Sequence, residues 1–145
     1  WCGHGITPQG GVDEASINCM SRGLYENSLW FKFNEASIVT LIGFDPGISI
    51  SIGDVIDVCG DPNQVMVMTS VEFEYWVTDA NIRFDNLQLS VFLPTSSDPF
   101  YRVDSSVLIA NLFFSDPDTY AYISIDNRYS VEWKGFGEYE APSSP

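Results

Sequence analysis

Basic residues are scarce in this sequence: Lys and Arg number 6 against 20 Asp and Glu, which gives a net charge of -14. A surface this acidic repels nucleic acid and anionic lipid. Long apolar runs are also missing, since the most apolar stretch, at 36–44, is far shorter than the roughly 20 residues that a membrane-spanning helix needs. We therefore expect no nucleic-acid partner and no membrane insertion, and a surface that suits cations, neutral sugars or a basic partner.

Groups that could catalyse a reaction are few. The one histidine, His4, lies in a Gly-rich N-terminal stretch, and any Ser-His-Asp or Cys-His arrangement would depend on it. No G-x-S-x-G elbow, phosphate-binding loop, dinucleotide fingerprint or H-E-x-x-H motif occurs. Glu72 and Glu74 would point the same way from one strand and could not flank a glycosidic bond. The sequence predicts a protein that is not an enzyme.

Cysteine is sparse too, with only Cys2, Cys19 and Cys59. The chain begins with Trp1 rather than Met, as removal of a signal peptide would leave it, and we expect a secreted, extracellular protein. In that setting a disulfide between Cys2 and Cys19 is the favoured pairing, with Cys59 left over. Alternatives stay open: Cys59 as a buried free thiol or a bridge to another chain, or a Cys3His zinc site that joins the three cysteines to His4.

Apolar and aromatic residues, in contrast, are abundant at 45% and 14%, enough for the core of one domain. From residue 28 onward the apolar residues alternate with a period of two, and turn sequences such as "GDPN" and "SDPD" separate the stretches. This pattern predicts an all-β fold, a single antiparallel β-sandwich of jelly-roll or immunoglobulin-like type over 28–138. The expected strands span 28–34, 36–43, 47–52, 54–58, 64–69, 70–78, 86–93, 106–114, 119–126 and 129–134.

The two ends of the chain are expected to differ from the sandwich. Residues 1–27 are expected to be irregular, with a short helix over 13–23 that Asp13 would cap. Residues 139–145 form a tail rich in Pro and Ser. We expect the whole chain, 1–145, to form one domain.

The segment "SVEFEYWV", at 70–77, gives the strongest indication of function. As one strand it would place its side chains alternately on two faces. The core face would carry Val71, Phe73, Tyr75 and Val77, and the outward face Glu72, Glu74 and Trp76. A Trp beside two carboxylates, on the face away from the core, predicts a residue that contacts a partner.

Two further predicted strands present aromatic side chains outward in the same way. Trp30 lies outward in 28–34, and Tyr120 and Tyr122 lie outward in 119–126. Exposed aromatic residues grouped on one face mark contact surfaces, where they stack on sugars or anchor protein interfaces. The alternative is a second packed layer, in which the N-terminal segment or the tail covers these rings.

Two functions from different classes would use such a face. The first is a non-catalytic structural subunit of an extracellular assembly, such as a filament, sheath or particle coat, that contacts other copies of itself. The second is a carbohydrate-binding module of a secreted enzyme, with an extracellular glycan as the partner. The outward aromatic residues, the odd number of cysteines and the lack of a catalytic set favour the assembly subunit.

Acidic turns make Ca²⁺ a candidate ligand that would stabilise the fold. Calcium binds several oxygen atoms from flexible acidic loops, and a net charge of -14 favours counter-ions. Asp and Asn also occur in turns for backbone reasons alone. The first candidates are Asp79, Asn81, Asp116 and Asp118, and a further acidic cluster contains Asp54, Asp57, Asp61 and Asn63.

Overall fold

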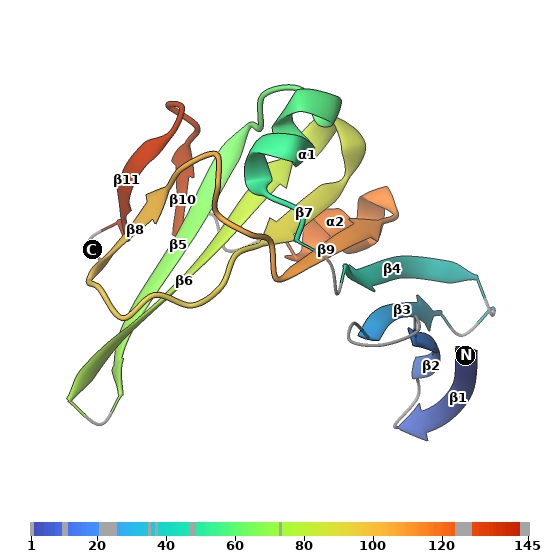
Figure 1. The fold of residues 1–145 in the computed structure, drawn as a ribbon. Helices are drawn as coiled ribbons and strands as arrows, with labels where there is room; N and C mark the ends of the chain where they lie inside the picture. The colour runs from blue at the N-terminus through green and yellow to red at the C-terminus, as the bar shows by residue number, and fades with distance from the viewer. Residues whose placement is uncertain are drawn as a thin grey trace.

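Figure 1 shows the fold in a computed structural model that describes residues 2–9, 12–20, 26–34, 36, 38–46, 49–72, 74–123 and 129–142. For 2–28 and 122–123 the description is confined to the backbone. Most of the described residues lie in two antiparallel sheets. The large sheet has the spatial order β1 (Cys2–Gln9), β2 (Val12–Met20), β3 (Glu26–Phe33), β4 (Val39–Asp45), β9 (Asn111–Ser115), β7 (Leu89–Phe92), β6 (Tyr75–Phe84), β5 (Gln64–Glu72) and β10 (Ser130–Glu132).

The remaining elements lie at the ends of these strands or pack on the sheet (Figure 1). They are the two-stranded sheet of β8 (Phe100–Val103) and β11 (Gly137–Glu140), the helices α1 (Ile52–Cys59) and α2 (Pro117–Ile123), and the short 3-10 helix η1 (Asp85–Leu87). The predicted antiparallel and predominantly β fold is therefore confirmed. The arrangement as a sandwich, of jelly-roll or immunoglobulin-like type, stays a prediction.

The hydrophobic core lies on one face of the large sheet, which we call the core face. Helix α1 and the small sheet supply the residues that cover it. Tyr101 and Tyr139 bring the small sheet into the same cluster, and the Tyr101 hydroxyl donates a hydrogen bond to the Pro94 carbonyl at 2.5 Å. The fully buried centre contains Ile52, Val65, Val67, Ile82, Val91 and Val103.

The N-terminal segment is regular, so the expected irregular structure over 1–27 and the helix over 13–23 are wrong for the described residues. Strand β2 pairs with β1 on one side and with β3 on the other. In this register Ile17 lies opposite Leu29, within the apolar row of β3. Pairing of two β-rich segments has overridden a weak helical spacing.

Helix α1 stands where the sequence predicted a strand at 54–58, and that prediction is wrong. A capping box closes its first turn: the Asp54 N–H donates to Ser51 Oγ at 3.2 Å, and the Ser51 N–H donates to the Asp54 carboxylate at 2.8 Å. Ile52 and Val55, three residues apart, are buried against the core face. The three-residue spacing of the buried side chains, typical of a helix, therefore outweighs the alternation that suggested a strand.

The strand predicted over 119–126 is also wrong, because α2 occupies this segment as far as it is described. Pro117 begins the helix, where its missing N–H is not needed. The Asp116 carboxylate accepts the backbone N–H of Thr119 at 3.0 Å and caps the first turn. At the end of the chain, the tail predicted at 139–145 begins inside β11, and 143–145 lie outside the described residues.

The predicted disulfide can be tested through the β1–β2 ladder, in which Cys2 lies directly opposite Cys19. Opposed residues of antiparallel strands have Cα atoms about 4.5–5.5 Å apart, a separation that a disulfide can bridge. We expect the non-reduced chain to be lighter than the reduced chain by two hydrogens. After unfolding without reduction, only Cys59, a half-buried free thiol, should be alkylated. Alkylation of all three cysteines without reduction would contradict the pairing.

Candidate functional site

The hairpin of β5 and β6 projects beyond the rest of the large sheet (Figure 1). The two strands pair from Gln64–Arg83 to Glu72–Tyr75. The neighbouring strand β7 pairs with β6 only over 81–84, and beyond it lies the isolated bridge of Thr78 with Ser96. The end of this hairpin, residues 70–77, therefore extends past its last cross-strand support.

Three large side chains are exposed on this end of the hairpin, and we call Val71, Tyr75 and Trp76 the apolar tip. Their exposed fractions are 59%, 73% and 46%. Glu72 and Glu74 are exposed beside them. The apolar tip is thus a convex apolar surface with two carboxylates.

The predicted single strand at 70–77 is wrong, because the chain turns between β5 and β6. Glu74 has a left-handed φ of 74°, and Phe73 lies outside the described residues. Across the turn, Trp76 is the direct partner of Val71, so the two side chains share a face instead of lying on opposite faces. The expected core positions of Val71 and Tyr75 are therefore wrong, since both are exposed.

Trp76 lies on the core face of the sheet. The same face of β6 carries Thr78, Ala80 and Ile82, all of which are buried. Trp76 is exposed because α1 and the small sheet do not reach this end of the hairpin, not because it points away from the core. A partner that covers Trp76 would extend the core face of this chain.

Thr78 fixes the base of the hairpin and is fully buried. Its hydroxyl donates to the Asp98 carbonyl at 2.5 Å and lies 3.2 Å from the hydroxyl of Thr69. Its backbone N–H and C=O each pair with Ser96 at 2.9 Å. These bonds anchor the hairpin at its base, directly before the apolar tip.

The opposite face of the sheet, which we call the open face, carries a row of aromatic side chains. Trp30 is the partner of Gly43, and Gly43 is the partner of Phe113. A Cβ atom at Gly43 would lie 2.1 Å from Cε2 of Trp30, so the indole occupies the space that this glycine leaves above β4. Phe113 packs edge-to-face against Trp30 and against Phe92, with ring centroids 4.9 Å apart in both pairs.

Two adjoining pockets on the open face share Phe92, and together we call them the open-face groove. One pocket has a volume of about 280 Å³, and the other about 180 Å³. Asn81 lies in the larger pocket with only 6% of its surface exposed, and its Oδ1 atom has no hydrogen-bond partner. The groove is lined by Met66, Met68, Asp79, Asn81, Arg83 and Phe92 in the larger pocket and by Trp30, Lys32, Leu41, Ser90 and Phe113 in the smaller one.

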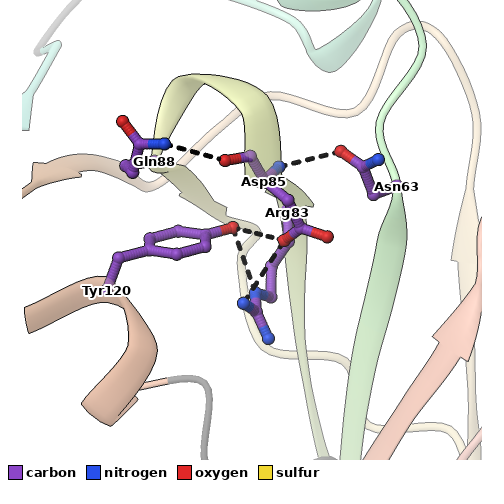
Figure 2. Close-up of polar contacts among 5 residues, drawn as sticks. All are labelled: Asn63, Arg83, Asp85, Gln88 and Tyr120. Carbon is purple, nitrogen blue, oxygen red and sulfur yellow. Dashed lines mark hydrogen bonds and ion pairs between the residues drawn. The ribbon is translucent and has the colours of Figure 1, made fainter. Parts of the chain in front are cut away.

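A polar cluster beside the groove joins α2 to the sheet (Figure 2). The buried Arg83 donates from Nε to the Tyr120 hydroxyl at 3.2 Å, and its Nη2 lies 3.3 Å from Oδ1 of Asp85. The Tyr120 hydroxyl donates to the same Asp85 oxygen at 2.8 Å, and its ring lies 4.8 Å from the guanidinium carbon. Asn63 and Gln88 each hold the backbone of Asp85, at 2.8 and 3.1 Å.

Tyr120 is therefore a buried residue, and the outward position predicted for it is wrong. Burial raises the pKa of its hydroxyl to about 12, so it stays protonated and keeps its bond to Asp85. The structure describes only the backbone of Tyr122, so the outward position predicted for its side chain stays a prediction. Trp30 lies on the face opposite Leu29, as predicted, but it is half-buried among other rings.

The four residues predicted to bind calcium lie on two elements. Asp79 and Asn81 are on β6, where Asp79 accepts a hydrogen bond from the Thr95 hydroxyl at 2.8 Å. Asp116 and Asp118 are at the start of α2, and the hydrogen bonds that Thr119 donates hold the pKa of Asp116 below its usual value. Within the described ranges, no three His, Cys, Asp or Glu side chains form a metal-binding group. Calcium binding stays a prediction.

Among the residues with a described placement, no helix is long and apolar enough to cross a membrane. No family model, curated protein or solved structure matches this chain. The function must therefore be argued from its own surfaces, above all the apolar tip and the open-face groove.

Proposed function

We propose that this chain is a non-catalytic structural subunit of an extracellular assembly and that the apolar tip is its contact surface. The observation that carries the proposal is the exposure of Val71, Tyr75 and Trp76 together at the end of one anchored hairpin. Isolated apolar residues are common on surfaces, but a group of large ones on a projecting element is typical of an interface. Burying the Trp76 side chain alone would contribute roughly 2–3 kcal/mol.

The backbone of the tip supports the same proposal. Glu74 adopts a φ of 74°, which residues other than Gly, Asn and Asp rarely take. Such a conformation costs about 1–3 kcal/mol and is retained mainly where a site depends on it. Here it makes the turn that places Tyr75 and Trp76 at the end of the hairpin.

Net charge sets the conditions under which the chain should assemble. Copies that each carry -14 repel one another, and the repulsion reaches about 30 Å at ~0.01 M salt but only about 10 Å at ~0.1 M. We expect sedimentation velocity to show self-association that rises with protein concentration and is stronger at ~0.5 M than at ~0.01 M salt. A chain that remains monomeric across both series would argue against an assembly subunit.

The carbohydrate-binding alternative is less well supported. A sugar-binding platform needs flat ring faces open to solvent. On the open face, Trp30 and Phe92 meet Phe113 at interplanar angles of 66° and 90°, so these rings pack on one another instead. Retention on insoluble polysaccharide by a strictly monomeric chain would favour this alternative.

The proposal also includes features that await their own tests. The chain is also proposed to be secreted, and Ca²⁺ would bind through Asp79, Asn81, Asp116 or Asp118. A sandwich of jelly-roll or immunoglobulin-like type is proposed for the packing of the two sheets. None of these features is needed for the apolar tip to act as a contact surface.

A further inference from the structure

We infer that the apolar tip of one copy binds in the open-face groove of a second copy, with the Trp76 indole in the larger pocket. In this contact the indole N–H donates a hydrogen bond to Oδ1 of Asn81. The inference rests on the proposed assembly function and assigns the surface that receives the tip.

The larger pocket has the size and lining that an aromatic side chain needs. Its volume is about 280 Å³, whereas an apolar cavity of about 150 Å³ already holds a benzene ring. Met66, Met68 and Phe92 form much of its lining. Thioether sulfur atoms make favourable contacts with aromatic rings, and flexible Met side chains adapt to the shape of a ligand.

Asn81 supplies the polar specificity of the pocket. Its Oδ1 atom is buried and has no hydrogen-bond partner, an arrangement that destabilises a protein unless a ligand provides a donor. The indole of Trp76 is a donor only, and the rest of it is apolar. The exposed side chain of the tip thus matches both the apolar lining and the unpaired acceptor of the groove.

Charge also favours a contact between tip and groove. Lys32 and Arg83, two of the six basic residues of the chain, line the groove, and Asp79 is the acidic residue among its described lining. Arg83 is paired with Asp85 within the cluster of Figure 2, and Lys32 lines the smaller pocket, which Asp79 does not reach. The tip carries Glu72 and Glu74, which we place at the Lys32 end.

A symmetric contact between two tips fits the same observations less well. It would bring Glu72 and Glu74 of both copies together, and like charges that meet at an interface are destabilising. It would also leave Oδ1 of Asn81 without a donor. We therefore favour the contact between two different surfaces, in which each copy offers one tip and one groove.

The test is a mixing experiment with two variants that each lack one surface. Trp76→Ala keeps the groove and loses the tip, whereas Met66→Glu keeps the tip and places a negative charge in the groove; Met66→Leu is the matched control. We expect each variant alone to be monomeric in sedimentation velocity, and the mixture to form a one-to-one pair and nothing larger. Met66→Leu should assemble like the parent chain.

A third variant tests the hydrogen bond. Asn81→Leu keeps the volume of the side chain and removes the acceptor, so we expect self-association about tenfold weaker, with a melting temperature no lower than that of the parent chain. If Met66→Glu has a lower melting temperature than the parent chain, its loss of self-association could reflect unfolding, and Asn81→Leu becomes the deciding variant. Unchanged self-association of Asn81→Leu would overturn the inference.

Other outcomes separate this inference from the function on which it rests. If Met66→Glu assembles like the parent chain while Trp76→Ala does not, the tip binds another tip, and the inference fails while the assembly function stands. If the parent chain is monomeric under all conditions, both fail.

Discussion

Replacing Trp76 with alanine is expected to give a folded monomer that no longer self-associates. The side chain is 46% exposed and lies past the elements that cover the core face, so its removal opens no enclosed cavity. We expect the free energy of unfolding to fall by no more than about 1–2 kcal/mol, against about 3–5 kcal/mol for truncation of a buried aromatic residue. Self-association, in contrast, should be lost at concentrations where the parent chain assembles.

The measurement combines sedimentation velocity with urea unfolding of the same samples. Phe136→Ala is the matched control, because Phe136 is an aromatic residue with a similar exposure of 48% outside the hairpin, and it should leave self-association unchanged. A Trp76→Ala chain that loses about 3–5 kcal/mol would identify Trp76 as a core residue instead, and the contact-surface proposal would fail.

Replacing Arg83 with alanine is expected to be among the most destabilising single changes on the open face. Arg83 is buried, and its removal takes one partner from Tyr120 on α2 and one from Asp85, which keep only the hydrogen bond between them (Figure 2). Breaking a buried ion pair costs about 3–5 kcal/mol. Because the Asp85 side chain is 35% exposed and water replaces part of the interaction, we expect about 3 kcal/mol, at the lower end of that range.

The chain contains its own control for this change. Arg102 pairs with Glu138 at 3.6 Å, with exposed fractions of 71% and 52%, and such a surface pair contributes about 0–1 kcal/mol. Urea unfolding should therefore separate Arg83→Ala from Arg102→Ala by about 2 kcal/mol or more. Equal losses in the two variants would show that the cluster of Figure 2 does not hold α2 in place.

The period-two pattern predicted two strands in this region but not the turn that makes the tip. It predicted strands over 64–69 and 70–78, whereas the strands span 64–72 and 75–84, so the boundary between them was placed too early and the second strand ended six residues too soon. Nothing in "EFEY", at 72–75, marks a turn, because these four residues include no Gly, Pro, Asn or Asp. The residue with the left-handed backbone is Glu74. One undetected turn was enough to place Trp76 on the wrong face.

Helix α1 could have been predicted. Ser51 and Asp54 have the spacing of a capping box, and Ile52 and Val55 have the spacing of a buried helix face. The alternation in "DVIDV" suggested a strand because five residues fit either period. Short apolar runs need their flanking caps before a helix can be told from a strand.

The open-face groove could not have been predicted from local patterns. Its lining comes from six strands, β3, β4, β5, β6, β7 and β9, which the topology brings together from distant parts of the sequence. The position of Trp30 on the face opposite Leu29 follows from the alternation of a single strand. The positions of Gly43 and Phe113 beside Trp30 depend on the order of the strands in the sheet, which no single residue determines.

The apolar tip and the open-face groove are different surfaces of one chain, and this gives any assembly built from them a direction. At one end the last copy exposes a tip, and at the other end the last copy exposes an empty groove, unless the series closes into a ring. The two ends would grow by different encounters. A copy without Trp76 can join only the end that exposes a tip and stops growth there, whereas a copy with a blocked groove stops growth at the opposite end.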